Sequence, residues 1–209
     1  MRYFIRSPWW LRQLYKGCLW QIPTKDKKIY LTFDDGPHPS VTPYVLDRLK
    51  EHNARATFFC VGKNVEAYPE VYKRILEEGH AVGNHTFDHL DGWATPDKRY
   101  LDNIAEARRL IVSDLYRPPY GRITRFQLRQ LAAPGFNLKT VMWSILSGDF
   151  DKSISGADCM QNVVLRIEPG SIVVFHDSEK AYERLSYALP AVLKYFSSRE
   201  YSFDKITSA

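Results

Sequence analysis

The feature that most limits the fold of this chain is the alternation of short apolar runs with helical patterns. Runs typical of buried strands occupy residues 29–33, 56–61, 80–83, 138–145 and 171–175, and we expect a final strand at 201–206. Helical patterns begin at Thr42-Pro43, at Pro69 and near Thr95-Pro96, and others lie near 124–132, 156–167 and 183–197. Repeated strand-then-helix order predicts an α/β fold with a mostly parallel sheet, open or closed into a barrel, and helices outside it.

The composition is that of one ordinary globular domain. The chain has 209 residues, of which 44% are hydrophobic and 25% are charged, and it shows no internal repeat and no low-complexity linker. Such a chain is long enough to bury a sizeable core. The net charge is +5, but Lys and Arg are scattered among acids rather than gathered in a block. We therefore expect no nucleic-acid partner.

The first 27 residues differ from the body of the domain, which spans 28–209. They are basic and aromatic, and they lack both the continuous apolar core of a signal peptide and an uninterrupted membrane span. Two alternatives are open. The segment could lie on a membrane as an interfacial helix, or it could pack against the domain, which we favour because no clean helical stripe is present. The interfacial alternative would use Trp9, Trp10, Trp20, Arg6, Arg12 and Lys16. On this basis the protein is expected in the cytoplasm or at the periphery of the cell envelope.

The three cysteines give little chemistry. Cys18, Cys60 and Cys159 are widely spaced and form no C-x-x-C pair. Neither a disulfide framework nor a thiolate zinc site is indicated.

Two adjacent carboxylates end the first expected strand. In "IYLTFDDGP" the apolar run stops at Asp34 and Asp35, and Gly36-Pro37 then turns the chain. Like charges this close are unfavourable at low dielectric unless a cation or a shared proton relieves them. The pair predicts either a bound cation nearby or, less interestingly, a solvated turn.

Polar residues also follow other expected strands. Asp149 comes after the run at 138–145, His176-Asp177 ends the run at 171–175, and Arg117 follows a short apolar stretch. Active sites of parallel α/β sheets and barrels collect at the carboxyl ends of the strands. These side chains are therefore expected to meet in one site.

The stretch "HTFDH" could bind a cation that relieves the repulsion between the two carboxylates. We expect His85 and His89, four residues apart, to lie on one face of a helical turn, close enough to bind one metal ion. Two histidines and one aspartate leave open positions, which is typical of a catalytic zinc or a similar divalent ion. The other aspartate could then take a proton from water as a general base. A nucleophile elbow, a P-loop and a G-x-G-x-x-G motif are all missing from the sequence.

Five motifs in this order, "TFDDGP", "HTFDH", "RPPYG", "WSILSGDF" and "IVVFHD", resemble those of polysaccharide deacetylases of carbohydrate esterase family 4, the nodulation-type deacetylase homology domain. The resemblance spans roughly residues 28 to 206. It implies a distorted, incomplete (β/α) barrel. It also implies a hydrolase of carbon–nitrogen bonds other than peptide bonds, which removes N-acetyl groups from amino-sugar glycans with the help of a metal ion, most often zinc.

The resemblance assigns roles to residues of this chain. Asp35, His85 and His89 would bind the metal, Asp34 would be the general base, and Arg117 would orient Asp34. The backbone N–H of Tyr120 would stabilise the oxyanion. His176 would be the general acid, with its pKa kept up by Asp149.

The fourth motif departs from the family pattern of two acids followed by Trp. Leu146 replaces the first acid, and Phe150 stands at the Trp position. The wall near the acetyl group and the sugar is therefore expected to differ, so the expected partner is named only as an N-acetylated oligo- or polysaccharide.

Two rival hypotheses stay open at this point. The protein could be a glycan-binding module that has lost turnover, although such a module has no use for an intact acid, base and metal site. It could also act on another carbon–nitrogen bond, such as a formyl group on a lipid-linked sugar.

Overall fold

A single curled sheet forms the centre of the computed structural model, which describes residues 3–207. Its strand order is β5-β4-β3-β2-β1-β7-β6, with β8 paired to β1, and the pairings are parallel. Strands β5 and β6 lie at the two ends of this order and do not pair with each other, so the barrel is incomplete, as the sequence predicted. The strands are β1 Lys28–Asp34, β2 Thr57–Cys60, β3 Ala81–Asn84, β4 Leu115–Tyr116, β5 Lys139–Thr140, β6 Ile145–Leu146, β7 Ile172–His176 and β8 Ser202–Phe203.

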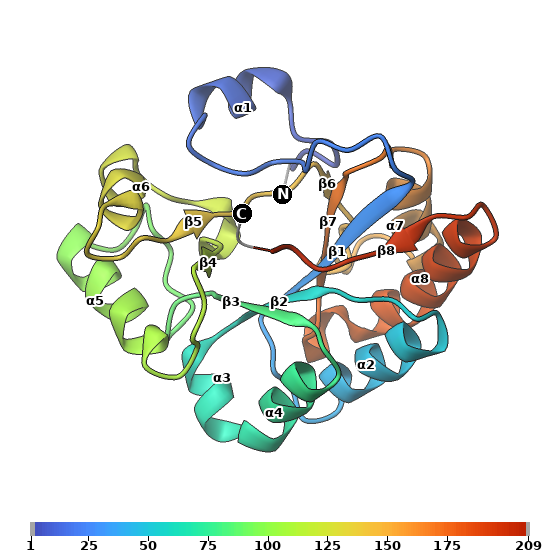
Figure 1. The fold of residues 1–209 in the computed structure, drawn as a ribbon, viewed down its shortest axis with the longest axis horizontal. Helices are drawn as coiled ribbons and strands as arrows, with labels where there is room; N and C mark the ends of the chain where they lie inside the picture. Colours follow the sequence, from blue (N-terminus) through green and yellow to red (C-terminus); the bar gives the residue numbers. More distant parts are fainter. Residues whose placement is uncertain (1–2, 208–209) are drawn as a thin grey trace.

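Helices surround the sheet on its outside (Figure 1). They are α1 Trp9–Leu14, α2 Val41–Glu51, α3 Gly62–Ala67, α4 Pro69–Glu77, α5 Asp97–Arg108, α6 Arg125–Ala132, α7 Gly156–Val164 and α8 Glu179–Ser197, and a short 3-10 turn spans Pro119–Gly121. Among residues 3–207, none of these helices is long and apolar enough to cross a membrane.

Strand β1 is the central strand, and it is apolar because both of its faces are covered. Ile29, Leu31 and Phe33 are fully buried in the largest core cluster, with residues of α2 and α8. Its neighbours are β2 and β7, and the register places Asp34 beside His176 on β7. The burial of β1 therefore fixes where the first pair of predicted site residues meets.

The run at 138–145 is not one strand, contrary to the prediction. It contains β5 and the first residue of β6, and residues 141–144 between them belong to neither strand. The guanidinium of Arg117 explains the break, because its Nε donates to the carbonyl of Val141 at 3.1 Å and its Nη2 donates to that of Met142 at 3.0 Å. Carbonyls that bind a buried cation are not available to a strand partner.

Several helix boundaries were also predicted wrongly. Helix α2 begins at Val41 after Ser40, so Pro43 is its third residue and not its first. Thr42 does not cap the helix; its hydroxyl donates to the buried carboxyl of Asp177. Helix α8 begins at Glu179 rather than near 183, helix α7 ends at Val164 rather than near 167, and the last strand covers only 202–203.

The N-terminal segment crosses the gap between β5 and β6 (Figure 1). At one edge the N–H of Leu146 donates to Ile5 at 2.8 Å, and at the other the N–H of Leu19 donates to Thr140 at 2.9 Å. Trp20 is buried, whereas 75% of Trp9 is exposed. The segment therefore packs on the barrel through its two ends, with α1 on the surface between them.

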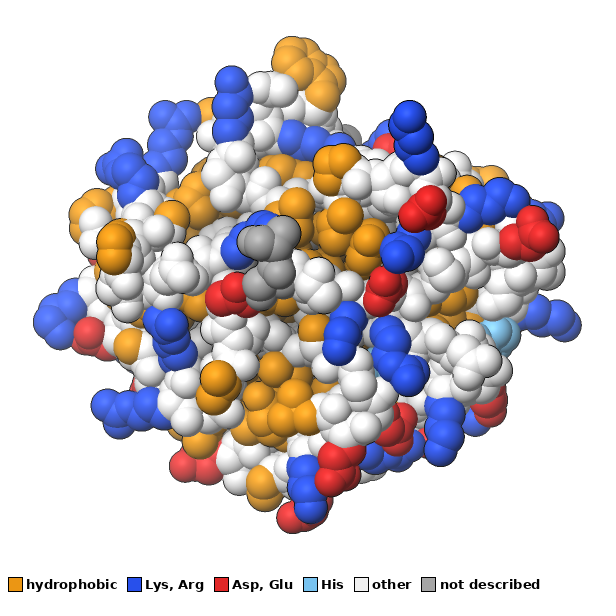
Figure 2. Space-filling view, in the orientation of Figure 1, with side chains coloured by type: hydrophobic (Ala, Val, Ile, Leu, Met, Phe, Trp, Pro, Cys, Tyr) orange, Lys and Arg blue, Asp and Glu red, His pale blue; other side chains and the backbone are white. Residues whose placement is uncertain are grey.

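Charged side chains of both signs are mixed on the face shown in Figure 2. Lys and Arg are interspersed there with Asp and Glu, and small apolar areas lie between them.

Candidate active site

The predicted site residues converge at the carboxyl ends of the strands. A cavity of about 510 Å³ is lined by Asp34, Asp35, His85, His89 and His176, among others. Two further predicted residues, Arg117 and Asp149, are fully buried. Arg117 contacts Asp34 and Asp149 contacts His176, so both act on the cavity through a residue that lines it.

Asp35, His85 and His89 form a group that could hold a metal ion. One ligand atom from each lies within 4.8 Å of the others. Oδ1 of Asp35 is 3.1 Å from Nε2 of His89 and 3.8 Å from Nε2 of His85. Two imidazole nitrogens and a carboxylate oxygen are a donor set that suits a catalytic divalent ion with open positions.

The charge states of these side chains fit a metal ligand set. Burial lowers the pKa of His85 to about 4, so its ring is neutral at pH 7 and keeps a lone pair. Burial alone would raise the pKa of Asp35, but the hydrogen bond with His89 and the nearby charge of His176 hold it below its ordinary value. A neutral imidazole beside an ionised carboxylate is the form that binds a cation.

Hydrogen bonds orient both rings toward Asp35. Nδ1 of His85 donates to the carbonyl of Arg117 at 2.8 Å, which leaves Nε2 as the nitrogen with the lone pair. Nδ1 of His89 is 3.2 Å from the hydroxyl of Tyr120. Partners of this kind fix the tautomer and the orientation of metal-binding histidines.

The loop that carries the two histidines is not a helical turn, contrary to the prediction. Thr86 and His89 both have left-handed backbone, with φ of 64° and 58°. Oδ1 of Asn84 accepts the N–H of Thr86 at 2.8 Å, and the hydroxyl of Thr86 accepts the N–H of Leu90 at 3.1 Å. Such side-chain bonds compete with helix formation, and here they stabilise a tight loop that still brings both rings together.

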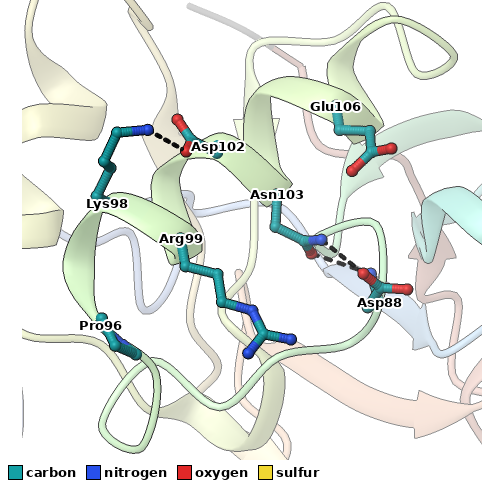
Figure 3. A pocket seen from close by; sticks show the side chains of 7 residues that line it. All are labelled: Asp88, Pro96, Lys98, Arg99, Asp102, Asn103 and Glu106. Carbon is teal, nitrogen blue, oxygen red and sulfur yellow. Dashed lines mark hydrogen bonds and ion pairs between the residues drawn. The ribbon is translucent and has the colours of Figure 1, made fainter.

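Asn103 on α5 holds the middle of the same loop. Its Oδ1 accepts the N–H groups of Phe87 and Asp88 at 2.9 and 3.0 Å, and its Nδ2 donates to Oδ2 of Asp88 at 2.7 Å. Figure 3 shows the Asn103 side chain pointing from the helix to Asp88. Sequence reasoning missed this residue, because only the folded loop brings it beside the histidines.

Arg117 and Asp34 form a buried ion pair. Nη1 of Arg117 donates to Oδ1 of Asp34 and to the hydroxyl of Thr32, both at 2.7 Å. The guanidinium lies 4.1 Å from the ring centre of Phe59. Burial lowers the pKa of Arg117 and the charge of Asp34 opposes this. The cation compensates the charge of an ionised Asp34, which is the form a general base needs.

Asp149 and His176 form a second pair on the other side of β1. Nδ1 of His176 is 2.7 Å from Oδ1 of Asp149. Burial alone would lower the pKa of His176, but the charge and the hydrogen bond of Asp149 raise it to about 10. The ring is therefore protonated at neutral pH and can serve as a proton donor.

Asp177 supports the turn that carries Asp35, a role that sequence reasoning missed. Its Oδ1 accepts the N–H of Gly36 at 3.0 Å. A Cβ on Gly36 would lie 2.0 Å from Oδ2 of Asp177, so only glycine allows this approach. Burial raises the pKa of Asp177 to about 8. Its place next to His176 in the sequence was the available signal.

Aromatic side chains complete the cavity. Tyr120 has left-handed backbone at φ 60° and is 61% exposed. Trp143 is only partly buried and also lines the cavity. The ring centre of Phe150 lies 5.3 Å from that of His176. Phe150 thus packs against the imidazole in a T-shaped arrangement, at the position where the family pattern has Trp.

Comparison with known proteins places this geometry in a family. A family model described as polysaccharide deacetylase matches residues 21–138. Over 194 residues the chain is 34% identical to a peptidoglycan-N-acetylglucosamine deacetylase of Bacillus cereus, with 90% of each chain covered. The chain belongs to the polysaccharide deacetylases of carbohydrate esterase family 4.

The chain is also similar to other polysaccharide deacetylases. The chain is 36% identical over 170 residues to a chitooligosaccharide deacetylase of Azorhizobium caulinodans, with 75% of this chain and 77% of the relative covered. The fold is similar to the crystal structure of the Bc1960 peptidoglycan N-acetylglucosamine deacetylase in complex with 4-naphthalen-1-yl-N-oxidanyl-benzamide. The TM-score is 0.85 at 31% identity, and the match covers 96% of this chain and 95% of the other. The predictions of family and of barrel type are confirmed.

Proposed function

We propose that this polysaccharide deacetylase removes N-acetyl groups from amino-sugar glycans of the chitooligosaccharide or peptidoglycan type, using a bound zinc ion. The observation that carries the proposal is the placement of Asp34 and His176. They are partners in the β1–β7 register, and both line the cavity that contains the three candidate metal ligands. A base and an acid beside one metal group are what hydrolysis of an amide requires.

Asp35, His85 and His89 would hold the metal through one oxygen and two nitrogens. A divalent ion held there would supply Lewis-acid chemistry, which favours attack on the acetyl carbonyl and deprotonation of the attacking water. Zinc is favoured because its protein sites prefer this ligand set with an open position.

The remaining steps belong to side chains of the chain itself. Asp34, oriented by Arg117, takes a proton from the attacking water. The backbone N–H of Tyr120 donates to the oxygen that gains negative charge. His176 donates its Nε2 proton to the sugar nitrogen as the carbon–nitrogen bond breaks, so that acetate and a free amine leave.

Two alternatives are less well supported. A glycan-binding module without turnover would not need a buried Arg117–Asp34 pair and a His176 kept protonated by Asp149. A deformylase acting on a lipid-linked sugar would use the same acid and base, and it is separated from a deacetylase only by the acyl group released.

The test is a screen for acetate and for formate. Purified protein loaded with zinc is incubated with chitooligosaccharides, peptidoglycan fragments, acetylated xylan and a formylated amino sugar. We expect acetate from one or both of the first two substrates. Release of formate alone would contradict the proposal, as would no release from any substrate by metal-loaded, folded protein.

A further inference from the structure

The N-terminal segment forms one side of the active-site cavity. The side chains that it contributes are apolar or aromatic, except for one serine. They are Tyr3, Phe4, Ser7, Pro8, Leu11, Tyr15 and Trp20. We refer to these seven side chains as the N-terminal wall.

The N-terminal wall is held in place by bonds to the loops around the site. The hydroxyl of Ser7 donates to the carbonyl of Trp143 at 2.6 Å, and that of Tyr3 donates to Oδ2 of Asp151 at 2.9 Å. The hydroxyl of Tyr15 donates to the carbonyl of Ile123 at 3.2 Å. These attachments reach the loops on both sides of the cavity, so the wall is a built part of the site.

One end of the wall lies next to the proposed acid. The ring of Tyr3 lies 5.0 Å from that of Phe150, which in turn lies against His176. An aromatic row therefore leads from the N-terminal segment to the atom that would protonate the leaving nitrogen. A sugar whose nitrogen meets His176 would extend toward this row.

Phe4 is the most exposed side chain of the wall, and its ring packs edge-on against that of Trp10. Its side chain lines the cavity, yet 58% of it is exposed. A cavity of about 510 Å³ is within the range of roughly 300–1,000 Å³ that encloses whole small-molecule ligands. The cavity is therefore larger than one acetamido group requires, and Phe4 offers an apolar surface at its mouth.

The N-terminal wall also lies outside the stretch matched by the family model, which begins at residue 21. The metal ligands and the base lie inside it. The parts of the site that bind metal and the part that forms the wall therefore come from different regions of the chain.

We propose that the N-terminal wall binds the sugar next to the one that is deacetylated, and that it sets the preference for oligosaccharides over a single sugar. Tyr3, Phe4 and Leu11 contact the apolar face of that neighbouring ring. The proposal rests on the proposed function, because it assumes an amino-sugar chain in the cavity.

The experiment compares Phe4→Ala and Leu11→Ala with Trp9→Ala. Trp9 belongs to the same segment, is exposed and does not line the cavity, so it is the matched control. Substrates are N-acetylglucosamine oligomers of one to five sugars, or peptidoglycan fragments of matched lengths if these react faster. Thermal unfolding and metal content are measured for each variant, and Phe4→Ala should fold normally because its side chain is mostly exposed.

We expect Phe4→Ala and Leu11→Ala to raise KM for oligomers about tenfold, with kcat, bound metal and any turnover of the single sugar unchanged. Trp9→Ala should behave as the wild type. If the wild type is active and Phe4→Ala and Leu11→Ala have the same KM as the wild type, the proposal is overturned. The wall would then only close the side of the barrel. Wild type that releases no acetate from any of these glycans would instead contradict the proposed function.

Discussion

Asp149 holds His176 with both of its carboxylate oxygens. Oδ1 accepts from Nδ1 of the ring and Oδ2 accepts the backbone N–H of His176, each at 2.7 Å. Asp149 is itself fixed, because Nε of Arg184 donates to its carbonyl at 2.7 Å. The imidazole can therefore turn only its Nε2 toward the cavity.

This pair predicts the alkaline side of the pH profile. The pKa of His176 is about 10, whereas free histidine titrates near about 6.5. The rate should therefore stay high above neutral pH and fall as pH rises through about 10. Asp149→Asn removes the charge that raises the pKa, so the alkaline limb of kcat should move to lower pH with bound metal unchanged. An alkaline limb that did not move would show that Asp149 does not raise the pKa of the general acid.

The same shift affects stability. Because the folded-state pKa is raised, the ion pair stabilises the fold fully below pH ~6.5 and loses this contribution as pH rises through the folded-state value. Thermal unfolding of the wild type and of Asp149→Asn should therefore differ more at pH 6 than above pH 10.

His176→Ala should lower kcat on the order of 100- to 10,000-fold, with metal content retained.

Metal binding and proton transfer should separate by mutation. His85→Ala and His89→Ala each remove one of three ligands, so metal content and activity should be lost together. Asp34→Asn should keep about one metal ion per chain, because Asp34 is not in the ligand group, and should lower kcat on the order of 100- to 10,000-fold. Metal content by mass spectrometry and acetate release check both. Near-normal turnover by Asp34→Asn would show that Asp34 is not the general base.

Asn103 should affect metal affinity without touching the metal. Asn103→Ala leaves the N–H groups of Phe87 and Asp88 without their acceptor, so the loop between the two histidines should loosen. We expect metal affinity to fall on the order of 10- to 100-fold, as for other residues that support metal ligands. Asp102→Ala is the control, because Asp102 is the adjacent residue and pairs with the exposed Lys98 rather than with the histidine loop (Figure 3). If Asn103→Ala and the wild type have equal metal affinities in a competition titration with a chelator, the conformation of the loop does not depend on Asn103.

Deletion of residues 1–20 tests how the N-terminal segment is attached. It removes the buried Cys18 and Trp20 and uncovers the Met142 side chain that packs with them. We expect a lower midpoint of thermal unfolding. The full-length protein should not sediment with anionic vesicles; sedimentation that salt reverses would favour the interfacial alternative.

The sequence predicted the elements whose causes are local. The apolar run that ends at Asp34 is a central strand, and Pro69 begins α4. The polar residues at the strand ends were expected in one place because parallel strands end at one edge, and the structure brings them together there.

What the sequence could not show depends on distant partners. The break inside 138–145 comes from Arg117, which lies more than twenty residues earlier in the chain. The shape of the histidine loop comes from Asn103 on another element. Neither effect leaves a periodic pattern in the affected segment, so local propensity could not reveal it.

The closure of the barrel gap by the N-terminal segment has a consequence for synthesis on the ribosome. The N-terminal segment must wait for partners made much later: Ser7 bonds to Trp143, 136 positions onward, and Arg6 pairs with Glu168, 162 positions onward. Contacts this distant in sequence form slowly. A nascent chain can therefore build the central strands early, but the cavity acquires its last side only when most of the chain has left the ribosome.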